Sequence, residues 1–170
     1  MNIRLCEMTK ELARIYYKDF VMDPGLFMDM TQFRPYVYSI EKCDETVERH
    51  RSLGRVYLAV MLNNRPIGEI ILKNIDREHS SCVLGIHLQN DQVKNKGYGT
   101  QAEILAIQYA FGELKLKTVL ADAVQKNRRS QRVLTKAGFK ETHSDDTFIY
   151  YRCDQDCWTG CVAIETAEAL

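Results

Sequence analysis

The stretch Lys94-Asn95-Lys96-Gly97-Tyr98-Gly99-Thr100 decides the fold of this chain. Its two glycines lie between an expected strand and a long apolar helix expected at residues 98–112. Glycine has no Cβ atom, so the backbone can approach a ligand closely at these positions. Free N–H groups and the helix dipole favour a phosphate at a helix N-terminus. The stretch therefore predicts a phosphate-binding turn.

A second group of residues follows the next expected strand, at residues 117–124. Asn127 is a good N-cap for a short helix expected at residues 128–137, and Ser130 lies in the first turn of that helix. Gly138, which precedes Phe139, would end the helix in a left-handed conformation. The two groups thus mark the helix starts of consecutive strand–helix units.

The remaining chain shows strand and helix patterns without an internal repeat. Helices are expected at about residues 10–20 and 40–53, with Thr9 and Ser39 as caps. A hairpin turn is expected at residues 63–66, where Asn64 is a candidate for positive φ. Further strands are expected at residues 2–7, 56–62, 67–72, 81–88, 139–142 and 148–152. This order predicts a mixed α/β layer.

Length and composition limit the class of protein. A chain of 170 residues predicts one domain, and 23 basic against 23 acidic residues argue against a nucleic-acid binder. Apolar runs are too short to cross a membrane, and the first residues show no secretory signal, so we expect a cytoplasmic protein. In that compartment the six cysteines are expected to be reduced thiols.

Together, the two groups of residues resemble the acetyl-CoA site of the GNAT superfamily of N-acetyltransferases. The spacing of Asn127 and Ser130 before Lys136-Ala137-Gly138-Phe139 looks most like the branch that acetylates the N-termini of ribosomal proteins. The resemblance covers residues 1–152 and implies a central, mostly antiparallel sheet with splayed strands flanked by helices. A Rossmann site fits less well because its third glycine is missing, and no Walker phosphate loop occurs.

The resemblance also implies which residues bind the cosubstrate. N–H groups from Asn95 to Thr100 would hold the diphosphate, and Lys94 stands where the family usually has Gln or Arg. Asn127 would hydrogen-bond the pantetheine arm. The residues expected to contact acetyl-CoA are Ile86, His87, Leu88, Lys94, Asn95, Lys96, Gly97, Tyr98, Gly99, Thr100, Asn127 and Ser130.

The implied reaction is direct attack of a primary amine on the acetyl thioester. Backbone N–H groups at residues 86–88 would stabilise the oxyanion, on a strand opened by a bulge at Gly85. The family often has a tyrosine acid where this chain has Leu134. The acid would then be Ser130, Tyr150, Tyr151 or water.

The general base is left open by the sequence. Val83 replaces a glutamate that many relatives carry on this strand. His87 is a candidate, because imidazole titrates near neutral pH, but it fits a packed strand histidine equally well. Glu69 is a second candidate, although a carboxylate on that strand more often faces solvent. Solvent itself can also take the proton.

The acceptor and the end of the chain are less defined. Residues 21–38 form either an acceptor wall or a satellite core, and their few acids argue against a polycationic acceptor. The wall would carry Met22, Phe27, Met28, Met30, Phe33 and Tyr36.

Residues 153–170 are expected to be a mobile tail or an edge for self-association as a homodimer. Cys153, Cys157 and Cys161 would share one stripe of a helix, but the short spacing of a zinc knuckle is absent, so no metal is expected. The alternative function is an acetyl-CoA sensor or interaction module without turnover, because Val83 and Leu134 replace two common catalytic side chains.

Overall fold

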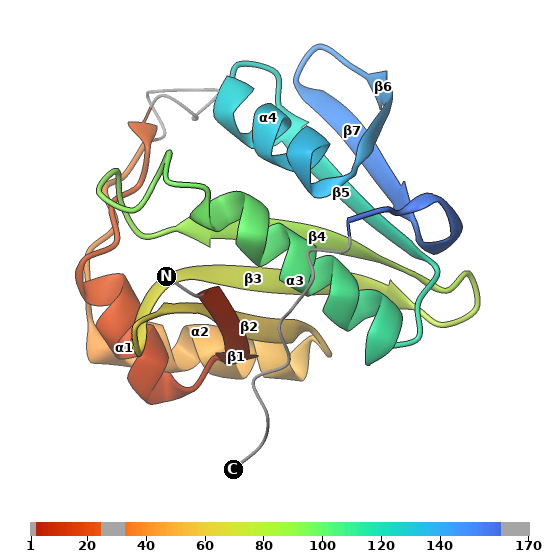
Figure 1. Cartoon of the computed structure of the whole chain (residues 1–170). Helices are drawn as coiled ribbons and strands as arrows, with labels where there is room; N and C mark the ends of the chain where they lie inside the picture. Colours follow the sequence, from red (N-terminus) through yellow and green to blue (C-terminus); the bar gives the residue numbers. More distant parts are fainter. Residues whose placement is uncertain (1–2, 25–32, 161–170) are drawn as a thin grey trace.

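One mixed sheet organises the molecule. The computed structural model describes residues 3–24 and 33–160, and within them seven strands lie in the order β1-β2-β3-β4-β5-β7-β6 (Figure 1). The strands are β1 (Ile3–Glu7), β2 (Val56–Leu62), β3 (Arg65–Asp76), β4 (Ser81–Leu88), β5 (Thr118–Val124), β6 (Lys140–Ser144) and β7 (Phe148–Asp154). Only the β4–β5 pair is parallel. The predicted α/β fold with a mostly antiparallel sheet is confirmed.

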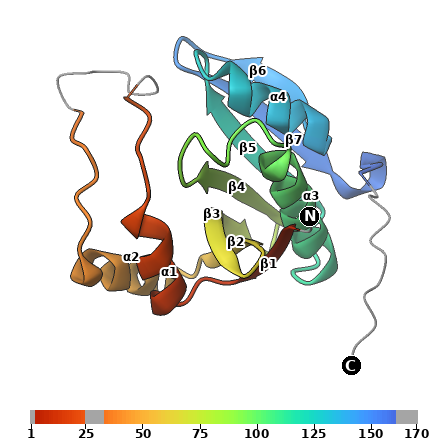
Figure 2. The same ribbon diagram turned by 60° about the vertical axis from the view of Figure 1, so that its left-hand side comes forward.

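Helices cover both faces of this sheet. Helices α1 (Lys10–Lys18) and α2 (Ile40–Ser52) lie on one face, and α3 (Tyr98–Gly112) and α4 (Arg128–Ala137) lie on the other (Figure 2). Alternate residues of β2 point to opposite faces, so Tyr57 and Ala59 pack towards α1 and α2 while Leu58 and Val60 pack in the main core with α3. No helix in the described part of the chain is long and apolar enough to cross a membrane.

Local signals fix several element boundaries as predicted. Thr9 accepts a hydrogen bond from the backbone N–H of Leu12, and Ser39 accepts one from Lys42, so both caps are confirmed. The hairpin after β2 is tighter than predicted, because Asn63 and Asn64 both have positive φ, at 48° and 63°, and close it alone. Strand β3 therefore begins at Arg65, before the expected start at residue 67.

Strands β4 and β5 separate along their length. They pair only from Ser81 with Thr118 to Leu84 with Ala121. Beyond that point β4 stays with β3 up to Leu88, and β5 stays with β7 up to Val124. The expected bulge at Gly85 is wrong: this residue pairs in register with Ile71, so the opening results from the loss of the β5 partner.

The last described residues belong to the folded structure. Strand β7 runs to Asp154, two residues beyond the expected end, and buries Cys153 opposite Val119. Cys157 is exposed in the 3-10 turn η3 (Gln155–Cys157), so Cys153 and Cys157 do not share a helical stripe; Cys161 lies outside the described residues. Trp158 then packs its ring against Phe111.

Candidate active site

A cavity of about 660 Å³ opens where β4 and β5 separate. The ends of both strands, the turn before α3, the start of α4 and the segment after α1 form its walls. The cavity brings together most of the residues expected to contact acetyl-CoA: Ile86, His87, Leu88, Lys94, Asn95, Gly97, Gly99, Thr100, Asn127 and Ser130. Lys96 is exposed outside this lining, and Tyr98 packs against the main core.

The turn that contains Gly97 and Gly99 at the start of α3, called the glycine turn below, has backbone N–H groups arranged to bind an anion. Gly97 is the N-cap of α3 with φ of 82°, and no side chain caps the first-turn N–H groups. These N–H groups have no partner within the helix, which favours a negatively charged ligand at this end. Gly99 serves packing as well, since a Cβ atom there would lie 3.6 Å from Val133 and 3.7 Å from Leu88.

Basic side chains surround the same turn. Lys94 is 12% exposed and its Nζ lies 3.0 Å from Asp91. Arg129, at the start of α4, pairs with Asp23 at 3.2 Å and with Asp91 at 3.8 Å. Arg132 also lines the cavity. This combination of cations and helix N-terminus fits the phosphate groups of acetyl-CoA.

Asn127 caps α4 as predicted. Its Oδ1 accepts a hydrogen bond of 3.1 Å from the backbone N–H of Ser130. The NH₂ group of the Asn127 side chain is the part that can donate to a ligand in the cavity. The predicted N-cap is therefore confirmed, and a binding role remains compatible with it.

The expected acid candidates have different positions. Leu134 is buried and lines the cavity, so this position offers no proton donor. Tyr151 is buried in the main core, and the hydroxyl of Tyr150 donates to Asp145 at 2.8 Å. Among the described residues that line the cavity, Ser130 is the candidate that remains besides water.

Glu69 is buried in a network of donors. The expectation that it faces solvent is wrong, since Glu69 is 4% exposed. The hydroxyls of Tyr57 and Tyr17 donate to its Oε2 at 2.5 Å and 2.8 Å. The Nδ1 atom of His87 lies 3.1 Å from its Oε1. Glu69 itself is absent from the described lining of the cavity, which it reaches through His87.

The network keeps the carboxylate charged. Burial opposes ionisation of Glu69, but the hydrogen bonds from His87, Tyr57 and Tyr17 hold its pKa below the usual value. Burial and the nearby carboxylate raise the pKa of Tyr17 and Tyr57, which stay protonated donors. With Nδ1 donating to Glu69, Nε2 of a neutral His87 ring is a proton acceptor.

Sequence reasoning did not find the two tyrosines. Glu69 pairs with Ala59, and Tyr57 lies two residues from Ala59 on the same strand face. This diagonal position was a usable signal, because side chains at such positions reach one another. Tyr17 gave no comparable signal, because it comes from α1, 52 residues away.

Aromatic rings cluster beside the network of Glu69. Tyr36 stacks on Tyr17 with ring centres 5.1 Å apart and meets Phe20 edge-on at 5.6 Å. Phe20 also lines the cavity. Phe27, Met28 and Met30, which were expected in this wall, lie outside the described residues.

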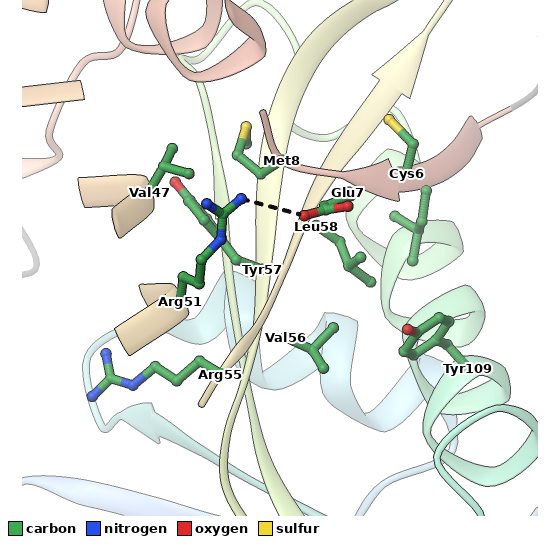
Figure 3. Close-up of a pocket in the computed structure, with 11 residues that line it drawn as sticks. Cys6, Glu7, Met8, Val47, Arg51, Arg55, Val56, Tyr57, Leu58 and Tyr109 are labelled. Carbon is green, nitrogen blue, oxygen red and sulfur yellow. Dashed lines mark ion pairs between the residues drawn. The ribbon is translucent and has the colours of Figure 1, made fainter. Parts of the chain in front are cut away.

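A second cavity of about 370 Å³ lies between the start of β2, the end of β1 and α2. Figure 3 shows Arg51 directed towards Glu7, and the two form an ion pair with an N–O distance of 3.9 Å. Tyr109, from α3, also lines this cavity. Its described lining contains none of the residues predicted for the active site. Across residues 3–24 and 33–160, no group of three or more His, Cys, Asp or Glu side chains is arranged to hold a metal ion.

Comparisons with known proteins relate this chain to acetyltransferases. The family model described as Acetyltransferase (GNAT) domain matches residues 2–140. A probable N-acetyltransferase, YjcK of Bacillus subtilis (strain 168), is 40% identical over 79 residues, which cover 45% of this chain. That match spans 42% of the relative, less than half of its length.

Solved structures share the fold. The aminoglycoside acetyltransferase AAC(6')-Ib, in complex with ribostamycin and coenzyme A, superimposes with a TM-score of 0.76 at 17% identity, covering 92% of this chain and 96% of the other. The ribosomal-protein-S5-alanine acetyltransferase from Vibrio fischeri gives a TM-score of 0.73 at 17% identity, covering 93% and 96%. At these identities the likeness concerns the fold alone.

Proposed function

The chain belongs to the GNAT family of acetyltransferases, and we propose that it transfers the acetyl group of acetyl-CoA to a primary amine. One observation carries the proposal: a single cavity joins the glycine turn, Asn127 and Ser130 to His87 at the opening between β4 and β5. The residues proposed to bind acetyl-CoA and the proposed proton acceptor thus line the same cavity.

The residues divide into two tasks. The N-terminus of α3 with Lys94 and Arg129 would hold the phosphates, and the NH₂ group of Asn127 would hold the arm of the cosubstrate. Acetyl-CoA supplies an activated thioester, which the amine attacks. His87, oriented by Glu69, would accept the proton of the amine through Nε2. Backbone N–H groups at residues 86–88 and the hydroxyl of Ser130 are proposed to face the reacting carbonyl and the leaving thiolate.

We propose that the acceptor is an amine with a partly apolar structure. Of the aromatic cluster, Phe20 lines the cavity together with His87, and its ring contacts those of Tyr17 and Tyr36; such a surface favours apolar or planar groups. Three acidic residues line the cavity: Asp23 is paired with Arg129, Glu103 is buried and Asp122 is exposed. This composition supports a peptide N-terminus or a small amine more than a polycation.

The test is release of free thiol from acetyl-CoA against a panel of small amines, antibiotics and peptides with free N-termini. Thermal shift by acetyl-CoA serves as the binding control. We expect stabilisation by acetyl-CoA and turnover with one acceptor class. A shift without turnover would favour a sensor without catalysis, and the absence of a shift would contradict the proposal.

Two further properties are proposed from the sequence. We propose a cytoplasmic protein with acetyl-CoA and an amine as its partners, supported by the balanced charge and by free thiols at five described cysteines. Self-association through the end of the chain is proposed as the route to a homodimer. Sedimentation of the full chain at several concentrations tests it.

A further inference from the structure

A buried acid, Glu103, lies in the mostly apolar helix α3. Glu103 is 0% exposed, and neither of its carboxyl oxygens has a hydrogen-bond partner in the structure. Its described neighbours in the helix, such as Ala102, Ile104 and Ala106, belong to the main core. A buried polar group without a partner costs stability, so the position calls for an explanation.

Glu103 belongs to the wall of the same cavity. It lies four residues after Gly99, which places the two on one face of α3. That face looks towards α4 and the end of β4, because a Cβ atom at Gly99 would contact Val133 and Leu88. Leu84 and Ala121, the last paired residues before β4 and β5 part, line the cavity together with Glu103. Glu103 thus lies about one helical turn further along α3 than Gly99.

The state of this carboxyl group follows from its surroundings. Burial raises the pKa of Glu103 to about 8, and no neighbouring charge contributes to the shift. The group is therefore protonated near neutral pH and carries an O–H donor. An ionised carboxylate at this depth, without a partner, would cost far more.

We propose that the uncharged carboxyl group of Glu103 donates a hydrogen bond to the acyl-pantetheine arm of the donor bound between β4 and β5. The arm offers amide and thioester carbonyl oxygens, which are acceptors and match a protonated acid. The contact gives Glu103 the hydrogen-bond partner that it lacks. Glu103 would then recognise the acyl-pantetheine end of acetyl-CoA. This assignment rests on the proposed function, because it requires an acyl-CoA in the cavity.

Two variants separate hydrogen bonding from shape. Glu103→Gln keeps an uncharged donor of similar size, whereas Glu103→Leu removes every polar atom. We expect Glu103→Leu to weaken binding of acetyl-CoA by about tenfold, the effect of one buried hydrogen bond, and Glu103→Gln to stay within about threefold of the wild type. Isothermal titration calorimetry with acetyl-CoA measures both. Because Glu103→Leu removes an unsatisfied buried group, it is expected to be at least as stable as the wild type, so weaker binding does not reflect unfolding.

An infrared difference spectrum gives an independent readout. The carbonyl stretch of a protonated carboxylic acid, identified by its loss in Glu103→Leu, should shift to lower frequency when acetyl-CoA is added. Unchanged affinity of Glu103→Leu for acetyl-CoA, or a carbonyl band that does not shift when acetyl-CoA is added, would overturn the assignment. Neither result would contradict acetyl transfer by the wild type. Failure of the wild type to bind acetyl-CoA would overturn the proposed function and this assignment together.

Discussion

Nδ1 of His87 lies 3.1 Å from a carboxylate oxygen of Glu69, its direct partner across the β3–β4 ladder. The two side chains differ sharply in environment, because that of His87 is 60% exposed and that of Glu69 is 6% exposed. The buried acid can therefore orient the ring while the ring remains open to a substrate.

His87→Ala should lower kcat by about 100-fold, the usual contribution of a positioned general base. The KM for acetyl-CoA should change little, because residues 86–88 are expected to contact acetyl-CoA through backbone N–H groups, which alanine keeps. His79→Ala is a matched control, since His79 also pairs with a carboxylate, Asp76 at 2.7 Å, but in the exposed turn after β3. Steady-state kinetics of both variants check this, and equal rates for His87→Ala and the wild type would leave solvent as the base.

Gly97→Ala should weaken acetyl-CoA binding by about tenfold, as loss of one hydrogen bond to a charged phosphate does. The left-handed φ of 82° at this N-cap strains any residue with a Cβ atom. Gly54→Ala is the control, because Gly54 has φ of 62° and equally open space, but follows α2. Both variants should lose about 1 kcal/mol of stability. Calorimetry should show weaker binding only for Gly97→Ala.

Asn127→Ala should combine two losses. Removing the cap of α4 costs about 1 kcal/mol in the free energy of unfolding, and removing the amide also weakens acetyl-CoA binding. Ser39→Ala removes the comparable cap of α2, whose hydroxyl accepts from Lys42 at 3.1 Å. Equal effects of the two substitutions on acetyl-CoA affinity, measured by calorimetry, would restrict Asn127 to capping.

Glu103 should make the free protein less stable as pH rises. Its pKa is about 8 in the folded chain, and about 4.3 is usual for an unfolded one. Between these values the unfolded chain has released a proton that the folded chain retains, so the free energy of unfolding falls with rising pH. In Glu103→Gln this contribution is absent.

The difference between Glu103→Gln and the wild type should therefore grow in favour of the variant from about pH 5 to about pH 8. Urea unfolding across this range measures it. Glu113→Gln, at the exposed end of α3, is the control and should follow the wild type. A pH-independent difference for Glu103→Gln would contradict the protonated state.

Trp158→Ala should lower the free energy of unfolding by about 2 kcal/mol, somewhat less than for a fully buried ring. The indole packs on Phe111 with ring centres 5.7 Å apart, and its Nε1 donates to the carbonyl of Ala137 at 2.9 Å. We propose that the folded domain extends at least to Trp158. A chain ending at Arg152 should unfold more easily than one ending at Gly160, and equal urea midpoints would place the boundary at residue 152.

Much of the fold was predictable because its signals are local. The helices at residues 98–112 and 128–137 were placed to the residue, since Gly97, Asn127 and Gly138 mark their ends. That the residues proposed to bind acetyl-CoA would lie together was predictable for the same reason, because two short segments supply most of them. The end of β7 was not, because pairing with β5, and no local pattern, carries that strand to Asp154.

The surroundings of the proposed base were less predictable, because they are assembled from distant elements. Period-two alternation assigns Glu69 to a face of β3 but cannot say what covers that face. Tyr17 from α1 and Tyr57 from β2 cover it. Their hydroxyls donate hydrogen bonds to the carboxylate, which is therefore buried and charged. A role for Glu103 was not predicted for a related reason, since a single acid in a mostly apolar helix gives no pattern.

The short seam between β4 and β5 has a consequence for motion. Only four residue pairs, from Ser81–Thr118 to Leu84–Ala121, join the two parts of the sheet. Opening fluctuations should therefore concentrate at this seam, where few backbone hydrogen bonds must break. A ligand that touches both parts would act as a clasp and slow amide hydrogen exchange in β4 and β5 alike. Amide hydrogen exchange at the seam would then be slowest with acetyl-CoA bound and fastest after the product has dissociated.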